Sequence, residues 1–63
     1  MEEIKNLREE REDLKLTQQD VAIMLGVGRV SYLNWENEPE IMPLGKYLTI
    51  IKKFEELRKL RDL

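Results

Sequence analysis

The chain has 63 residues, enough for one small domain that buries about 60% of the surface its unfolded chain exposes. Its composition, with 41% hydrophobic and 38% charged residues, is that of a globular protein, and no apolar run is long enough to span a membrane. Cysteine and histidine are both absent, which excludes disulfides, zinc–thiolate sites and histidine-based catalysis. These properties predict a cytoplasmic binding module that is not an enzyme and uses no metal or cofactor.

The formal net charge is −2, and the charge is distributed unevenly along the chain. Residues 1–16 carry four basic and six acidic side chains, and residues 17–45 carry one basic and four acidic side chains. Residues 46–63 carry six basic and three acidic side chains. A basic surface for nucleic acid is therefore expected only in the last third of the chain.

Helical spacing of the apolar residues predicts an all-α fold, and no alternating run of β-branched residues indicates a strand. The prediction is a single domain over residues 1–63, a compact bundle of four helices at about residues 2–14, 18–25, 29–36 and 43–62. The last helix, which is the longest, is expected to carry an apolar stripe formed by Leu44, Tyr47, Leu48, Ile51, Phe54, Leu57 and Leu60.

Local signals mark the ends of these helices. Thr17 is a suitable N-cap because its hydroxyl can accept a free backbone N–H, and Gly26 suits the left-handed position after the second helix. Residues 37–42 are predicted to form a loop, since Pro39 disfavours a helix there. Pro43 is predicted to lie in the first turn of the last helix.

The second and third predicted helices are joined by a glycine-containing turn and form one mechanical unit. Tyr32 and Trp35 are expected to bury one side of the third helix. The other side is left free, and a rigidly held helix with a bare side fits the major groove of DNA. That side carries Arg29, Val30, Leu33 and Asn34, with Ser31 at its edge.

The segment TQQDVAIMLGV (residues 17–27), followed by Tyr32, Trp35 and Glu36, resembles the helix-turn-helix of the phage-repressor and Cro-like DNA-binding family. The resemblance implies a sequence-specific transcriptional regulator or repressor that binds double-stranded DNA. Arg11 falls where that family has an arginine paired with the glutamate that ends the third helix. The resemblance therefore implies a structural ion pair between Arg11 and Glu36.

The resemblance also implies which side chains meet the bases. Arg29 would pair with guanine and Asn34 with adenine, while Val30 and Leu33 would face thymine methyl groups. Two alternatives remain open. Arg29 and Asn34 can instead be surface residues that touch only phosphate or water, and the two apolar side chains can pack against another protein.

Four further residues are expected to position the DNA backbone: Gln18, Ser31, Asn37 and Lys46. Gln18 starts the second helix, where it can contact a phosphate or act as a second cap behind Thr17. Lys46 can grip a phosphate or be a solvated residue of the last helix.

Three residues depart from the family pattern. Gly28 stands where relatives usually have a Ser or Thr that caps the third helix. Glu38 and Glu40 stand where relatives often have glycine and basic residues near the duplex, and their charges would repel phosphate. Because phosphate neutralisation supplies most non-specific affinity, we expect weak non-specific binding with a shallow salt dependence.

The C-terminal segment KKFEELRKLRDL (residues 52–63) has no Gly or Pro, so the last helix is expected to continue to its end. It is predicted to fold along the first helix and bury Ile4 and Leu7. The alternative is a dimer seam that also uses Ile23 and Met24, so the sequence allows a monomer or a homodimer.

Two other functions fit the same fold. One is a protein–protein interaction module of the antitoxin or antirepressor kind, for which the acidic loop is no handicap. The other is a designed scaffold without a ligand. Glu, Lys, Arg and Leu dominate both ends of the chain, as in sequences chosen for helix propensity and surface charge, so a designed miniature of the family that binds a chosen DNA duplex also fits.

Overall fold

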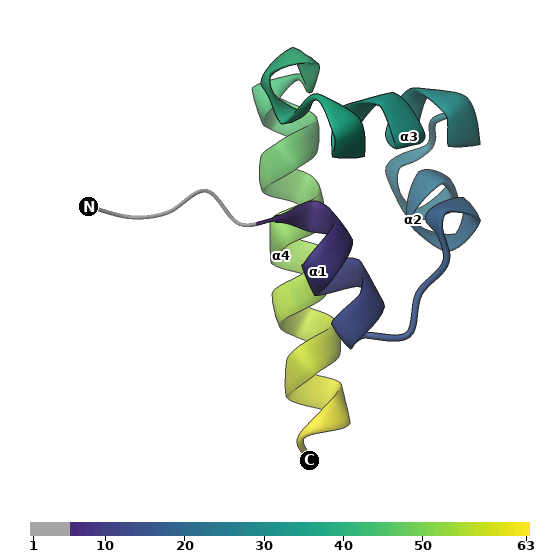
Figure 1. Cartoon of the computed structure of the whole chain (residues 1–63). Helices are drawn as coiled ribbons and strands as arrows, with labels where there is room; N and C mark the ends of the chain where they lie inside the picture. Colours follow the sequence, from purple (N-terminus) through teal and green to yellow (C-terminus); the bar gives the residue numbers. More distant parts are fainter. Residues whose placement is uncertain (1–5) are drawn as a thin grey trace.

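The computed structural model describes residues 6–63, and this part of the chain is all-helical. Its elements are α1 (Leu7–Asp13), α2 (Gln18–Leu25), α3 (Arg29–Asn37), the 3-10 helix η1 (Pro39–Ile41) and α4 (Leu44–Arg61). The long α4 runs the length of the molecule, α1 lies against it, and α3 crosses near its N-terminal end (Figure 1). The predicted all-α fold with four α-helices, the last one long, is confirmed.

The helix bounds differ from the sequence prediction at several ends, and α1 and α4 each stop one residue earlier than predicted, at Asp13 and Arg61. Residues 2–5 of the predicted first helix lie outside the described residues, and α1 begins after Asn6, whose side chain accepts the Glu9 N–H. α3 extends one residue further than predicted, to Asn37. The predicted loop at 37–42 is corrected by η1, because Pro39 occupies its first position, where the missing N–H costs nothing. Pro43 precedes α4 with an extended ψ of 136°, so its predicted place in the first turn is wrong.

Two local features fix the ends of α2, the first helix of the helix-turn-helix unit. The Thr17 hydroxyl accepts the Asp20 N–H at 3.0 Å, and the Asp20 carboxylate accepts the Thr17 N–H at 2.8 Å, which completes a capping box. These bonds lower the pKa of Asp20, and the bond from the Thr17 backbone N–H contributes most. α2 ends at Gly26, which is left-handed with φ of 71°. Both predicted end signals of α2 are confirmed.

The core lies where α2, α3 and α4 meet, and α1 closes one side of it. The other helices cover only one side of α4, and on that side its residues Ile50 and Phe54 are fully buried. Leu44, Leu48 and Leu60 of the predicted apolar stripe are instead exposed, because the stripe spans a wider arc than the neighbouring helices cover. The buried apolar residues are Leu7, Val21, Ala22, Leu25, Tyr32, Met42, Ile50 and Phe54.

The end of α4 is bound to α1 by charged groups. Arg58 forms ion pairs with Glu10 and Asp13, and Arg61 binds Asp13 at 3.1 Å. These contacts lower the pKa of Asp13, with the hydrogen bond from Arg61 as the main cause. Leu7 is buried as expected, and Ile4 lies outside the described residues. The predicted packing of α4 along α1 is thus present, but its C-terminal end is ionic rather than apolar.

Gly26 and Gly28 make a matched pair for testing the turn, because a Cβ at either position would meet no atom within 4 Å. Gly26 has positive φ, whereas Gly28 has an ordinary φ of −74°. We expect Gly26→Ala to lower the free energy of unfolding by about 1–2 kcal/mol. Gly28→Ala is expected to leave it unchanged or raise it by about 0.4–1 kcal/mol, because the unfolded chain loses freedom. Urea unfolding followed by circular dichroism measures both, and equal effects would contradict the assigned turn.

Candidate nucleic-acid interface

α3 has a buried side and a bare side. Tyr32 is fully buried and the Glu36 side chain is 3% exposed, and both face the rest of the domain. The residues of α3 predicted to meet DNA are exposed, apart from Leu33, which is half-buried. Gln18 and Lys46, outside α3, are half-buried as well. The structure therefore brings one group of predicted contacts onto a single helix surface: Arg29, Val30, Ser31, Asn34 and Asn37.

The buried side of α3 is held by a charged network centred on Arg11 of α1. Its Nε donates to the Glu36 carboxylate at 2.7 Å, and its Nη2 donates to the other carboxylate oxygen at 3.3 Å. Nη1 donates to the carbonyl oxygen of Leu16 at 2.9 Å. The Gln18 amide donates to Glu36 at 3.3 Å. One guanidinium thus connects α1, the loop before α2, and the C-terminal half of α3.

Burial and pairing act in opposite directions on these groups. Burial alone would raise the pKa of Glu36, but the hydrogen bonds from Arg11, and then the one from Gln18, hold it below the ordinary value of 4.5. The hydrogen bond to Glu36 likewise raises the pKa of Arg11. The Tyr32 hydroxyl is buried beside the pair without a well-aligned hydrogen-bond partner among residues 6–63. Burial, and then the Glu36 carboxylate, raise the pKa of Tyr32.

Two predicted backbone contacts have partners inside the domain. Gln18 uses one of its amide N–H groups on Glu36, which leaves a second N–H at the start of α2. Lys46 donates from Nζ to the carbonyl oxygen of Leu25 at 3.2 Å. This places a positive charge at the C-terminus of α2, where it satisfies a free carbonyl and the negative end of the helix dipole.

The two ends of α3 differ in charge. At its N-terminus Gly28 provides no side-chain cap, so no side chain of the N-cap residue binds the first backbone N–H groups. Arg29 adds a positive charge at this end. At its C-terminus the chain continues through Glu38 and Glu40, both exposed. The positive end of the helix dipole coincides with the positive side chain. The N-terminal end of α3 is therefore the end suited to phosphate and base edges.

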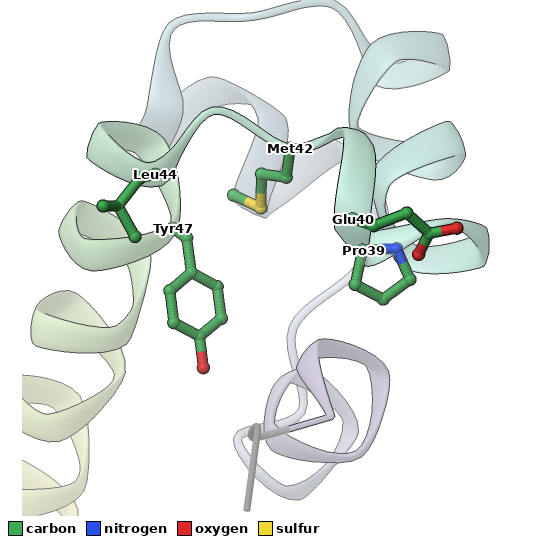
Figure 2. A pocket seen from close by; sticks show the side chains of 5 residues that line it. All are labelled: Pro39, Glu40, Met42, Leu44 and Tyr47. Atoms are coloured by element: carbon green, nitrogen blue, oxygen red, sulfur yellow. The ribbon is translucent and has the colours of Figure 1, made fainter.

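A groove of about 560 Å³ lies between η1 and the start of α4, outside the helix-turn-helix unit. Figure 2 shows Leu44 and Tyr47 on its α4 side, Pro39 and Glu40 on its η1 side, and Met42 between them. Within residues 6–63, no three His, Cys, Asp or Glu side chains come together as metal ligands do. No helix in that range has both the length and the apolar composition needed to cross a bilayer.

A family model described as a helix-turn-helix domain matches residues 4–63, nearly the whole chain. The chain belongs to this helix-turn-helix family. Comparison with curated proteins and with solved structures finds no match. The family assignment confirms the predicted DNA-binding helix-turn-helix class, and helix-turn-helix domains of this kind are typically not enzymes.

Sequence reasoning missed the internal partners of Gln18 and Lys46, since no local spacing indicates a bond between residues 18 or 21 positions apart. It also missed the ionic contact between α1 and α4, for which a signal existed. Acidic residues at 10 and 13 and arginines at 58 and 61 have the same three-residue spacing. On two helices expected to pack together, matched spacing of opposite charges predicts such pairs.

Removing one member of the Arg11–Glu36 pair should be more damaging than removing both. Each of Arg11→Met and Glu36→Met leaves a buried charge unpaired, which costs about 3–5 kcal/mol. The whole domain has about 3–9 kcal/mol of stability at this length, so either single variant should be largely unfolded at moderate temperature. The double variant Arg11→Met/Glu36→Met is expected to be more stable than either one. Thermal unfolding compares the three, and a stable single variant would show that the pair is not essential to the fold.

The same pair predicts how stability depends on pH. The pKa of Glu36 is lower in the folded than in the unfolded chain, so the folded state binds fewer protons. Its contribution is complete above the ordinary value of 4.5 and is lost as the pH falls through the lower, folded pKa. We expect the free energy of unfolding to decrease below that pH, and to decrease less steeply in Arg11→Met/Glu36→Met. Urea titrations at several pH values measure this dependence. If the free energy of unfolding changed equally with pH in the two proteins, Glu36 would not be a source of the pH dependence.

Proposed function

We propose that this domain binds double-stranded DNA sequence-specifically, with α3 in the major groove, and acts as a transcriptional regulator or repressor in the manner of phage-repressor and Cro-like proteins. The observation that carries the proposal is the rigidly held α3 with its exposed polar side. Family membership supports DNA as the partner. The buried network at Arg11 supports the mode, because a recognition helix needs one fixed orientation to meet base edges.

In this proposal Arg29 and Asn34 contact base edges. An Arg fork matches guanine O6 and N7, and an Asn amide matches adenine N6 and N7. Val30, whose side chain is 63% exposed, faces a thymine methyl group, and half-buried Leu33 contributes at the edge.

In this proposal, groups on and around α3 bind the DNA backbone. Ser31 and Asn37 are exposed on α3 and able to bind phosphate oxygens, and Gln18 has one amide N–H left for a phosphate. Lys46 has two N–H donors beyond the one given to Leu25. With Arg29 these are few cations, so we expect affinity to depend on salt only weakly.

A protein partner is the second candidate function. The large exposed apolar side chains of Ile23 and Val30, at 67% and 63%, favour it, as does the acidic stretch at Glu38 and Glu40. For such a partner the apolar side chains would be anchors and Arg29 and Asn34 would matter little. The two candidates therefore predict different effects of replacing Arg29 and Asn34: loss of binding to DNA, and little change in binding to a protein.

A selection from random duplex DNA at roughly 0.1 M salt tests the proposal, because long-range surface charge is largely screened there. We expect one enriched short site, or two inverted copies of it. Arg29→Ala/Asn34→Ala should then weaken binding to that site by about 5- to 150-fold for each lost base contact and relax the preference.

Lys59→Ala is the matched control, since it removes an exposed positive charge on α4, away from α3. It should leave the affinity and the preferred site nearly unchanged. No enriched site from folded protein would favour the protein-interaction module. An unchanged preference in Arg29→Ala/Asn34→Ala would contradict base contact by these two residues.

A further inference from the structure

The loop between α1 and α2 contains a strained lysine. Lys15 has φ of 61°, and within residues 6–63 it is the one residue other than glycine with positive φ. An L-residue is strained in this left-handed region, because its Cβ lies too close to the following carbonyl oxygen. The turn itself is regular, since the Lys15 N–H donates to the Glu12 carbonyl at 3.0 Å. Glycine would form the same turn without strain, so the position points to a use for the lysine side chain.

The fold itself makes no use of the charge of Lys15. Its side chain is exposed and forms no hydrogen bond or ion pair within the part of the chain that the structure describes. The acids just before it, Glu12 and Asp13, are paired with arginines at 3.6 Å and 3.1 Å. Asp20, at the start of α2, belongs to the capping box. A cation after the end of α1 gains less from the helix dipole than the strained backbone costs.

Lys15 lies close to a residue that we have proposed to hold the DNA backbone. Gln18 follows three residues later, so the two Cα atoms are at most about 11 Å apart. The loop between them is fixed, because the Leu16 carbonyl accepts an N–H of Arg11 at 2.9 Å. The same guanidinium binds Glu36 of α3, and so does the Gln18 amide. The network that orients α3 thus also sets where Lys15 stands relative to it.

We infer that Lys15 binds a phosphate of the DNA backbone beside the one held by Gln18. The inference rests on the proposed function and adds a phosphate contact that the sequence analysis did not contain. A lysine binds phosphate as a point charge on a flexible stem, so an exposed loop is a suitable place for it. Each cation that neutralises a phosphate releases counterions, and in an interface with few cations one more contact matters. Glycine would relieve the strain but could not bind.

Three variants separate the charge of Lys15 from its strain. Lys15→Gln removes the charge and keeps the strain, Lys15→Gly removes both, and Lys15→Arg keeps both. We expect Lys15→Gly to raise the urea midpoint of unfolding, and Lys15→Gln and Lys15→Arg to leave it nearly unchanged. On the duplex that the selection enriches, Lys15→Gln and Lys15→Gly should both bind about three- to tenfold more weakly at roughly 0.1 M salt, whereas Lys15→Arg should bind as the original chain does.

Fluorescence anisotropy from about 0.05 M to about 0.3 M salt measures these affinities, on the enriched duplex and on a scrambled one. Loss of one phosphate contact should lower the slope of log K against log salt by about 0.9 and weaken both duplexes alike, so the preferred site stays the same. Lys59→Gln is the matched control, since it removes the same charge from an exposed position on α4. It should change neither the affinity nor the slope.

Two results would overturn the contact and leave the proposed function standing. One is a chain that binds its enriched site while Lys15→Gln has the same affinity and salt slope as the original. The other is an equal loss in Lys59→Gln, which would mean that only the total charge matters. A chain that binds no duplex would overturn both the proposed function and the contact.

Discussion

The position of α3 depends on a charge that the core cannot leave unpaired. Arg11 is 8% exposed, and its guanidinium is hydrogen-bonded to the Glu36 carboxylate and the Leu16 carbonyl. The planar guanidinium can donate to both oxygens of a carboxylate in only a few geometries. The pair therefore holds α3 at one rotation about its axis. An apolar contact of similar area would tolerate several rotations. In so small a domain, with a core of few residues, this pair supplies the orientation that packing alone does not.

The remaining charges are divided between holding the fold and facing outward. Arg58 and Arg61 lie in the basic last third, where the sequence allowed a nucleic-acid surface, yet both bind acids of α1. Lys46 is likewise bonded to the end of α2. The positive charge near α3 is then mainly Arg29 and the free backbone N–H groups at its start. Recognition by such a surface rests on base edges and shape more than on the general attraction between cations and phosphates.

The sequence predicted best what neighbouring residues decide. Thr17 and Gly26 set the ends of α2 through bonds and backbone angles within a few residues, and both behave as expected. The buried side of α4 was predicted poorly, because Leu44 and Leu48 have the same helical spacing as core residues. Their exposure follows from which helices cover α4, a property of the whole fold. For the candidate site the sequence indicated the bare side of α3 except for half-buried Leu33, but not the internal bonds of Gln18 and Lys46.

The exposed side of α3 is short, and its length limits how much DNA one copy can contact. A recognition helix of nine residues spans about 13 Å, at about 1.5 Å per residue, and reaches only a few base pairs. Few cations surround it, so one copy gains little affinity from phosphates. Under the proposed function, the affinity of one copy for its site would therefore come mainly from the contacts of Arg29 and Asn34 with base edges.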